Sequence, residues 1–161
     1  MLLAASAYEL VLALHIMAVV IAFGWTFMLP VAFAVAAKAD PRTLPVLHRI
    51  EYTSERLLLN PALTVVVGAG IFMAIDGHLF GEFFVQWGIG AAIVIGYLAG
   101  SVLIPAAKRA EAAVLRDLEG FAGGEFVASE DYRAATRRLT LYGSATSLLA
   151  LATIAIMVLK P

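Results

Sequence analysis

His15 is the only histidine inside a long uncharged run of this chain, and it is the residue best suited to chemistry. A neutral imidazole can ligate haem iron, copper or zinc, and an ionisable side chain within a membrane segment is a functional candidate because its burial is costly. With a helical rise of about 1.5 Å per residue, His15 lies about 8 Å below the outer edge of its run. Counting to that depth on the other runs brings Met73 and Met157 level with it. We therefore predict that His15, Met73 and Met157 bind a cofactor, either one b-type haem or a metal ion.

Three glycines at the same depth, Gly70, Gly88 and Gly90, are predicted to leave room for a flat cofactor. Two haems with paired histidines are excluded, because the chain has three histidines and His48 lies in a different region. Two alternatives stay open for His15. It could hydrogen-bond a neighbouring helix through Thr153 or a backbone carbonyl, or it could take part in a proton relay.

A second group of metal-binding residue types lies in the short loop around residues 76–82. Asp76, His78 and Glu82 could bind a divalent cation weakly. The residues predicted for a metal ion are thus His15, His78 and Asp76. The alternative is a solvated turn formed by the Asp-Gly-His sequence.

The composition places these residues in a membrane protein. Hydrophobic residues make up 62% of the 161 residues and charged residues 14%, whereas an ordinary soluble domain is about half apolar and about a quarter charged. The net charge of −1 argues against nucleic-acid binding. The lack of cysteine excludes disulfides, thiol nucleophiles and iron–sulfur sites.

Four uncharged runs set the predicted fold, and the shortest has 19 residues. About 20 apolar residues in a helix cross the hydrocarbon core of a bilayer. We predict an all-α integral membrane protein, a bundle of four transmembrane helices that forms a single domain over residues 1–161. The predicted spans are 10–37, 57–75, 83–107 and 139–159.

The basic residues predict the orientation of the bundle. Ten of the eleven Lys and Arg residues lie in the first and third loops, and only Lys160 lies elsewhere. Positive loops stay in the cytoplasm, so both termini are predicted to lie outside it and the protein to reside in a bacterial inner membrane. Residues 1–7 hold no basic residue before an unusually long apolar run, so we expect no cleaved signal peptide.

The polar connections have their own predicted structure. A short amphipathic helix should lead into the second span, with a bend at Asn60-Pro61. The third helix should continue through 108–119 until Gly120, and Ser129 should cap the fourth. Exposed ion pairs are predicted for His48, Arg49, Glu51, Glu55 and Arg56. Topology signals or lipid-headgroup contacts are predicted for Arg133, Arg137 and Arg138.

Small residues form a ridge along the third span at steps of four, and Gly96 and Gly100 match a GxxxG motif. This ridge could pack inside the bundle or form a contact with a second copy or a larger membrane complex. Its members are Gly88, Ala92, Gly96 and Gly100.

Several segments resemble one bacterial membrane family, the domain of unknown function 2269. They are Leu14-His15-Ile16, the stretch 51–61 and the closing sequence Met157-Val158-Leu159-Lys160-Pro161. The chain is also distantly similar to copper-resistance D proteins and membrane protoporphyrinogen oxidases. That similarity implies a haem-binding role for His15. The oxidases pair their histidine with a lysine in the third span, where this chain has no lysine before Lys108.

The sequence thus predicts an integral inner-membrane protein that holds a haem b or metal at His15 for electron transfer or redox assistance. No nucleotide-binding or hydrolase motif is present. The alternatives are a non-enzymatic accessory or assembly subunit of a larger membrane complex, and a small pore or carrier.

Overall fold

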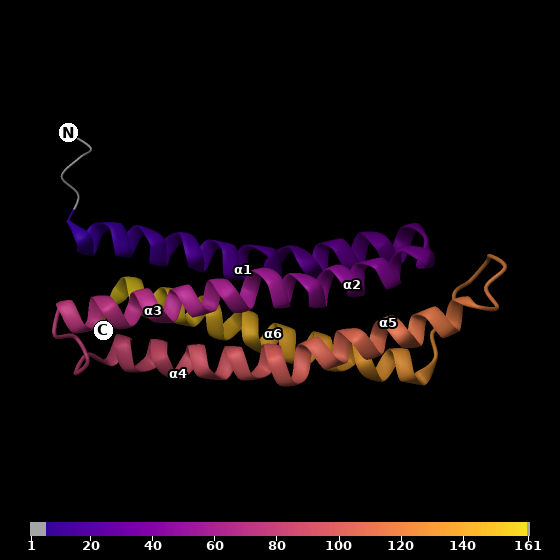
Figure 1. Cartoon of the computed structure of the whole chain (residues 1–161). Coiled ribbons are helices and arrows are strands. Elements are labelled where there is room, and N and C mark those ends of the chain that lie inside the picture. The colour runs from indigo at the N-terminus through magenta and orange to yellow at the C-terminus, as the bar shows by residue number, and fades with distance from the viewer. Residues whose placement is uncertain (1–5, 161) are drawn as a thin grey trace.

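Long helices build nearly all of the protein in the computed structural model, which describes residues 6–160 apart from the side chain of residue 37. Residues 1–5, on which the expected uncleaved N-terminus rests, and residue 161 of the closing sequence lie outside the described residues. The helices are α1 (Ala7–Ala39), α2 (Leu44–Ser54), α3 (Asn60–Asp76), α4 (Phe83–Leu98), α5 (Ile104–Leu118) and α6 (Glu130–Leu159). Figure 1 shows them side by side in one elongated bundle.

Four continuous helical stretches are long and apolar enough to cross a membrane. They are Ala7–Ala36, Pro41–Asp76, Phe83–Leu118 and Glu130–Leu159. The prediction of an all-helical fold with four helices long and apolar enough to span a membrane is confirmed. The second and third stretches have 36 residues each, which corresponds to about 54 Å of helix. A hydrocarbon core is only about 30 Å thick, so both stretches must extend beyond it.

The two longest stretches each contain one π-helical turn, at Glu55–Leu59 and at Ala99–Leu103. In each turn an amide donates to the carbonyl five residues earlier, from Asn60 to Glu55 and from Ile104 to Ala99. The next residue is a proline in both cases, Pro61 or Pro105, which has no N–H to donate. The wider turn therefore lets each helix continue where a proline would otherwise interrupt it.

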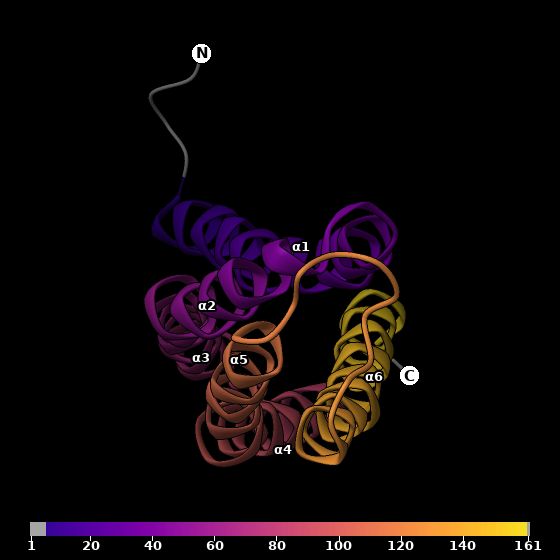
Figure 2. The ribbon, with the colours of Figure 1, turned by 90° about the vertical axis from the view of Figure 1, so that its right-hand side faces the viewer.

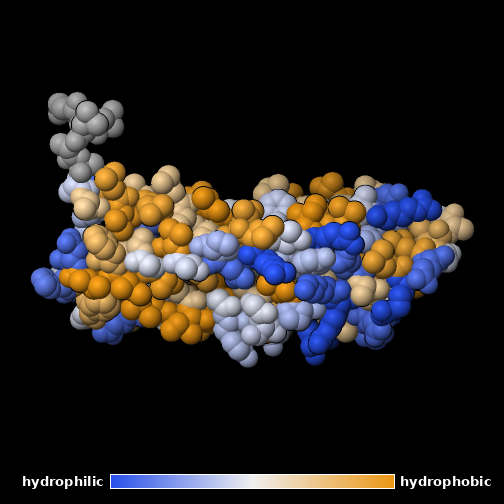
Figure 3. Space-filling model, in the orientation of Figure 1, coloured by the Kyte–Doolittle hydropathy of each residue, from blue (hydrophilic) through white to orange (hydrophobic). Residues whose placement is uncertain are grey.

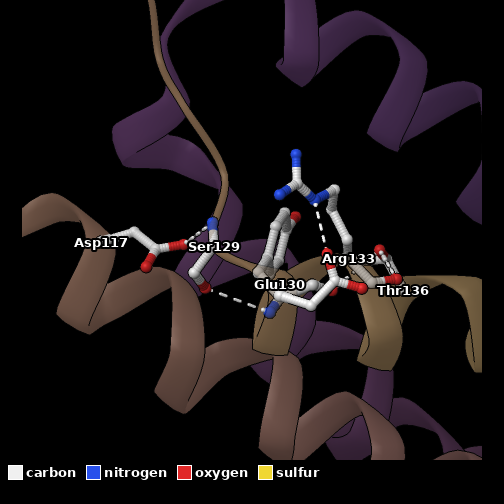
Figure 4. A network of polar contacts seen from close by, with 6 residues as sticks. Asp117, Ser129, Glu130, Arg133 and Thr136 are labelled. Atoms are coloured by element: carbon white, nitrogen blue, oxygen red, sulfur yellow. Dashed lines mark hydrogen bonds and ion pairs between the residues drawn. The ribbon is translucent and has the colours of Figure 1, made fainter.

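Serine side chains cap the starts of α1 and α6. Ser6 and Glu9 form a capping box at the start of α1. The Ser129 hydroxyl accepts the Tyr132 amide, and the Ser129 amide donates to Asp117 at 2.9 Å (Figure 4). The predicted cap of the fourth helix is confirmed. Gly123 and Gly124 have positive φ angles, so the chain turns there where most residues would be strained.

The bundle has two different ends. We call the end with α2, α5 and the start of α6 the basic end, and the end with the 77–82 turn the opposite end. The loop between α5 and α6 arches across the basic end (Figure 2), where Phe121 accepts a hydrogen bond from Arg42. Hydrophobic residues dominate the left half of Figure 3, while hydrophilic residues gather over the right half, where α2 and α5 lie.

The core of the basic end depends on a face of small residues on α5. Ala107, Ala110 and Val114 are completely buried. Through such residues α5 packs against both α2 and α6. Small side chains allow the helices to approach closely.

Enlarging this face should destabilise the bundle. We expect Ala110→Leu to lower the free energy of unfolding by about 1–3 kcal/mol, because the added side chain overpacks a filled interface. Ala112→Leu is the matched control, since Ala112 is exposed on the same helix. Thermal unfolding of both variants in detergent measures the difference, and equal unfolding midpoints would contradict the tight packing of α5.

Candidate functional site

His15 lies half-buried on α1 and hydrogen-bonds the backbone of α3. Its Nδ1 is 2.9 Å from the carbonyl oxygen of Val66. Because a carbonyl can only accept, Nδ1 must carry the proton. In a neutral imidazole the other nitrogen, Nε2, then holds a lone pair, and it has no hydrogen-bond partner among residues 6–160. This geometry agrees with the carbonyl alternative, and it is also the arrangement that orients ligating histidines.

Thr153, the other partner considered for His15, is engaged elsewhere. Its hydroxyl accepts a hydrogen bond from Trp87 Nε1 at 3.1 Å and donates to the Leu149 carbonyl at 2.8 Å. The Thr153 hydroxyl thus links α6 to α4 by a hydrogen bond, whereas the His15 imidazole is hydrogen-bonded to α3.

A cavity of about 320 Å³ adjoins His15 near the opposite end of the bundle. It is lined by α1, α3, α4 and α6, mostly with apolar side chains. His15, Met73 and Met157 all contribute to its wall, and Tyr8 and Lys160 add polar groups. The structure therefore brings the three predicted cofactor ligands to one cavity.

The glycines of this layer do not all act as predicted. Gly70 contacts the imidazole, since an added Cβ would lie 3.5 Å from His15 Cε1. At Gly88 an added Cβ would collide with the terminal methyl of Met157, so that space is already filled. Gly90 does not line the cavity. The prediction that all three leave room for a flat cofactor is therefore wrong at Gly88 and Gly90.

The residues of the 76–82 turn remain in solvent contact. Asp76, His78 and Glu82 are all exposed. Across residues 6–160 we find no group of three or more His, Asp or Glu side chains that could hold a metal ion. His15, His78 and Asp76 are thus not gathered into one three-residue site, and the turn has the geometry of the solvated alternative, with His78 at φ 54°.

A second polar cluster, which sequence reasoning placed on the surface, is buried at the basic end. The exposed fraction is 1% for His48 and 7% for both Glu51 and Glu55. His48 Nδ1 lies 3.0 Å from a Glu51 carboxylate oxygen, and its Nε2 lies 3.2 Å from the hydroxyl of Tyr132. The prediction of exposed pairs is wrong for these three side chains.

The burial has a clear cause in the length of the helices. Because α5 extends along α2 and Tyr132 of α6 reaches His48, these helices cover the face of α2 that sequence patterning assigns to water. His48, Glu51 and Glu55 are spaced by three and four residues, which places them on one face of a helix. That shared face is the feature of the sequence that could have indicated a polar cluster. Nothing in the sequence shows what packs against it.

Beside this cluster, Arg49 and Glu111 form an ion pair at 2.7 Å between α2 and α5. The Arg49 side chain is largely exposed, so the expectation of a surface position holds for this residue. Glu55 differs, because its Oε2 is buried and has no hydrogen-bond partner among the described residues. Charge on an unpartnered buried carboxylate has a large desolvation cost.

The small-residue ridge of the third span faces mostly inward. Gly88 meets Met157, and an added Cβ at Gly96 would lie 3.4 Å from Leu63. Ala92 packs against a core cluster that includes Ala22, Leu63, Ile95 and Ala150. Gly100 alone is exposed, with open space beside it. The ridge therefore serves internal packing at three of its four positions.

No family model, curated protein or solved structure matches this chain. The resemblance to the domain of unknown function 2269 and to copper-resistance D proteins stays an expectation from the sequence. The geometry of the cavity and of the buried cluster is therefore the basis for inferring a function.

Removing the Tyr132 hydroxyl should test whether its hydrogen bond to His48 stabilises the buried cluster. His48 Nε2 lies 3.2 Å from the Tyr132 hydroxyl, so Tyr132→Phe leaves a buried ring nitrogen without its hydrogen-bond partner. We expect the free energy of unfolding to fall by about 1–3 kcal/mol. Tyr142→Phe is the control because Tyr142 is exposed. Equal thermal unfolding midpoints for the two variants in detergent would argue against this hydrogen bond.

Proposed function

We propose that this protein holds a single redox-active metal centre at His15 and serves electron transfer or redox assistance to a larger membrane complex. One observation carries the proposal. His15, with a free lone pair on Nε2, shares its cavity with the thioethers of Met73 and Met157. Nitrogen and thioether donors in an apolar cavity are the ligand types that bind copper or haem iron.

The donor set and the available space favour a single soft ion, Cu(I), over a haem. Thioether sulfurs select Cu(I) among the biological metal ions. The cavity volume of about 320 Å³ is near the lower end of the range of about 300–1,000 Å³ for ligand pockets. A haem would require the Met157 methyl to leave its place against Gly88. A copper ion requires only that donors already at the cavity converge.

The protein's own residues would perform three tasks around such a centre. The Val66 carbonyl fixes the orientation and tautomer of the imidazole. The apolar wall keeps water from the ion and thereby tunes its potential. The bound centre supplies one-electron redox chemistry.

The location proposed for this activity is a bacterial inner membrane, with both chain termini outside the cytoplasm. The support is the asymmetry of charge, since ten of the eleven Lys and Arg residues lie at or next to the basic end. In this orientation the cavity opens toward the outer leaflet and the buried His48 cluster lies toward the cytoplasm.

The direct test is to purify the full chain in mild detergent from cells grown with copper and haem precursors. We expect about one copper ion per chain by elemental analysis, and its loss in His15→Ala. His78→Ala is the control, because His78 is exposed outside the cavity. A Soret band that is lost in His15→Ala would show that the group bound at His15 is haem and not copper. Neither copper nor haem in the purified protein would contradict the proposal.

Gly88 and Gly90 provide a second test, which asks whether Met157 is a ligand. Gly88→Ala should displace the Met157 thioether and weaken copper retention by about tenfold, as changes beside metal ligands commonly do. Gly90→Ala should have no effect, since its added methyl meets open space. A chelator competition assay measures both variants. Equal retention would exclude Met157 as a ligand.

A further inference from the structure

A groove at the basic end collects four arginines and has no part in the proposed metal site. It lies between α5 and α6 and has a volume of about 990 Å³. Arg109 comes from α5, and Arg133, Arg137 and Arg138 come from α6. The one carboxylate in the lining is Glu130, which pairs with Arg133 at 3.3 Å (Figure 4).

The other three guanidinium groups have no countercharge within the described residues. Arg109, Arg137 and Arg138 form neither an ion pair nor a side-chain hydrogen bond in residues 6–160. By contrast, Arg116 of α5 pairs with Asp131 of α6 at 3.1 Å. All three side chains are exposed, and an anion bound between them would offset the repulsion of their like charges. No carboxylate of the described residues pairs with them.

Apolar residues form part of the remaining wall of the groove. Val102, Pro105, Leu141 and Tyr142 line the same groove. From Glu130 to Tyr142, α6 advances by about 18 Å, so the groove leads from the polar end of the bundle into its apolar part. A free anion would use only the arginines, whereas a lipid would use both walls.

We propose that this groove binds the phosphate headgroup of an anionic phospholipid from the leaflet at the basic end. Arg109, Arg137 and Arg138 contact the phosphate oxygens, because guanidinium groups match phosphate geometry with paired hydrogen bonds. The acyl chains lie along Val102 and Leu141. Basic pockets between transmembrane helices are the usual sites for such headgroups. Three free guanidinium groups favour a lipid with two phosphates over a lipid with one.

The test uses the full chain, delipidated in a neutral detergent and titrated with cardiolipin, phosphatidylglycerol or phosphatidylcholine. Native mass spectrometry measures the retained lipid, and the thermal unfolding midpoint measures stabilisation. We expect cardiolipin to bind most tightly and phosphatidylcholine to have no specific effect. Arg137→Gln should weaken cardiolipin binding about fivefold, the effect of one basic residue near an anionic surface.

Two further variants keep the test decisive. Arg116→Gln is the matched control, since Arg116 is paired and lies outside the groove, and its affinity should stay unchanged. Arg137→Lys keeps the charge and the fold but loses the paired geometry, so it should fall between the wild type and Arg137→Gln.

Three outcomes would overturn the proposal. Equal binding of phosphatidylcholine would show that the headgroup charge is not recognised. Equal stabilisation by inorganic phosphate would assign the groove to a free phosphate. An equal loss of affinity in Arg116→Gln and Arg137→Gln would show a diffuse surface attraction without a defined site.

Discussion

Helices that exceed the thickness of the membrane set the architecture of this protein. Lipid offers no hydrogen-bond partners, so a spanning segment must satisfy its backbone internally, and a helix does so at any length. The stretches Pro41–Asp76 and Phe83–Leu118 continue well past the length that a bilayer needs. Their extra turns, together with the start of α6, build a second region outside the hydrocarbon. Polar side chains can be buried there among protein atoms.

The two regions solve the burial of polar groups differently. In the spanning region the hydrogen bonds are local, since His15 donates to a backbone carbonyl and Trp87 donates to Thr153. The Trp25 Nε1 and Thr146 hydroxyl groups are buried there without a partner among the described residues. At the basic end His48, Glu51 and Tyr132 form a connected chain across α2 and α6. The alanine face of α5 makes this chain possible, because it lets three helices approach closely enough to exclude water.

The sequence predicted what depends on the backbone and missed what depends on neighbours. The four helices and the Ser129 cap were predictable, because helix length and capping are local properties. Depth counting placed Met73 and Met157 near His15, since every helix has the same rise per residue. The filled space at Gly88 was not predictable, because it depends on the conformation of Met157 on another helix. The burial of His48 was missed for a similar reason, since a polar helix face does not identify what covers it.

The π-helical turns have a consequence for how the two regions relate. Each turn inserts one residue into an otherwise regular helix, and one residue corresponds to a rotation of about 100° around the helix axis. The parts of each long helix before and after the turn can therefore present unrelated sides to their neighbours. Deleting a single residue from either turn would restore the regular α-helical hydrogen-bond pattern. It would also rotate the part of the helix after the turn relative to the part before it. The extra residue thus sets, along one continuous helix, which side faces the cavity at one end and which side faces the buried cluster at the other.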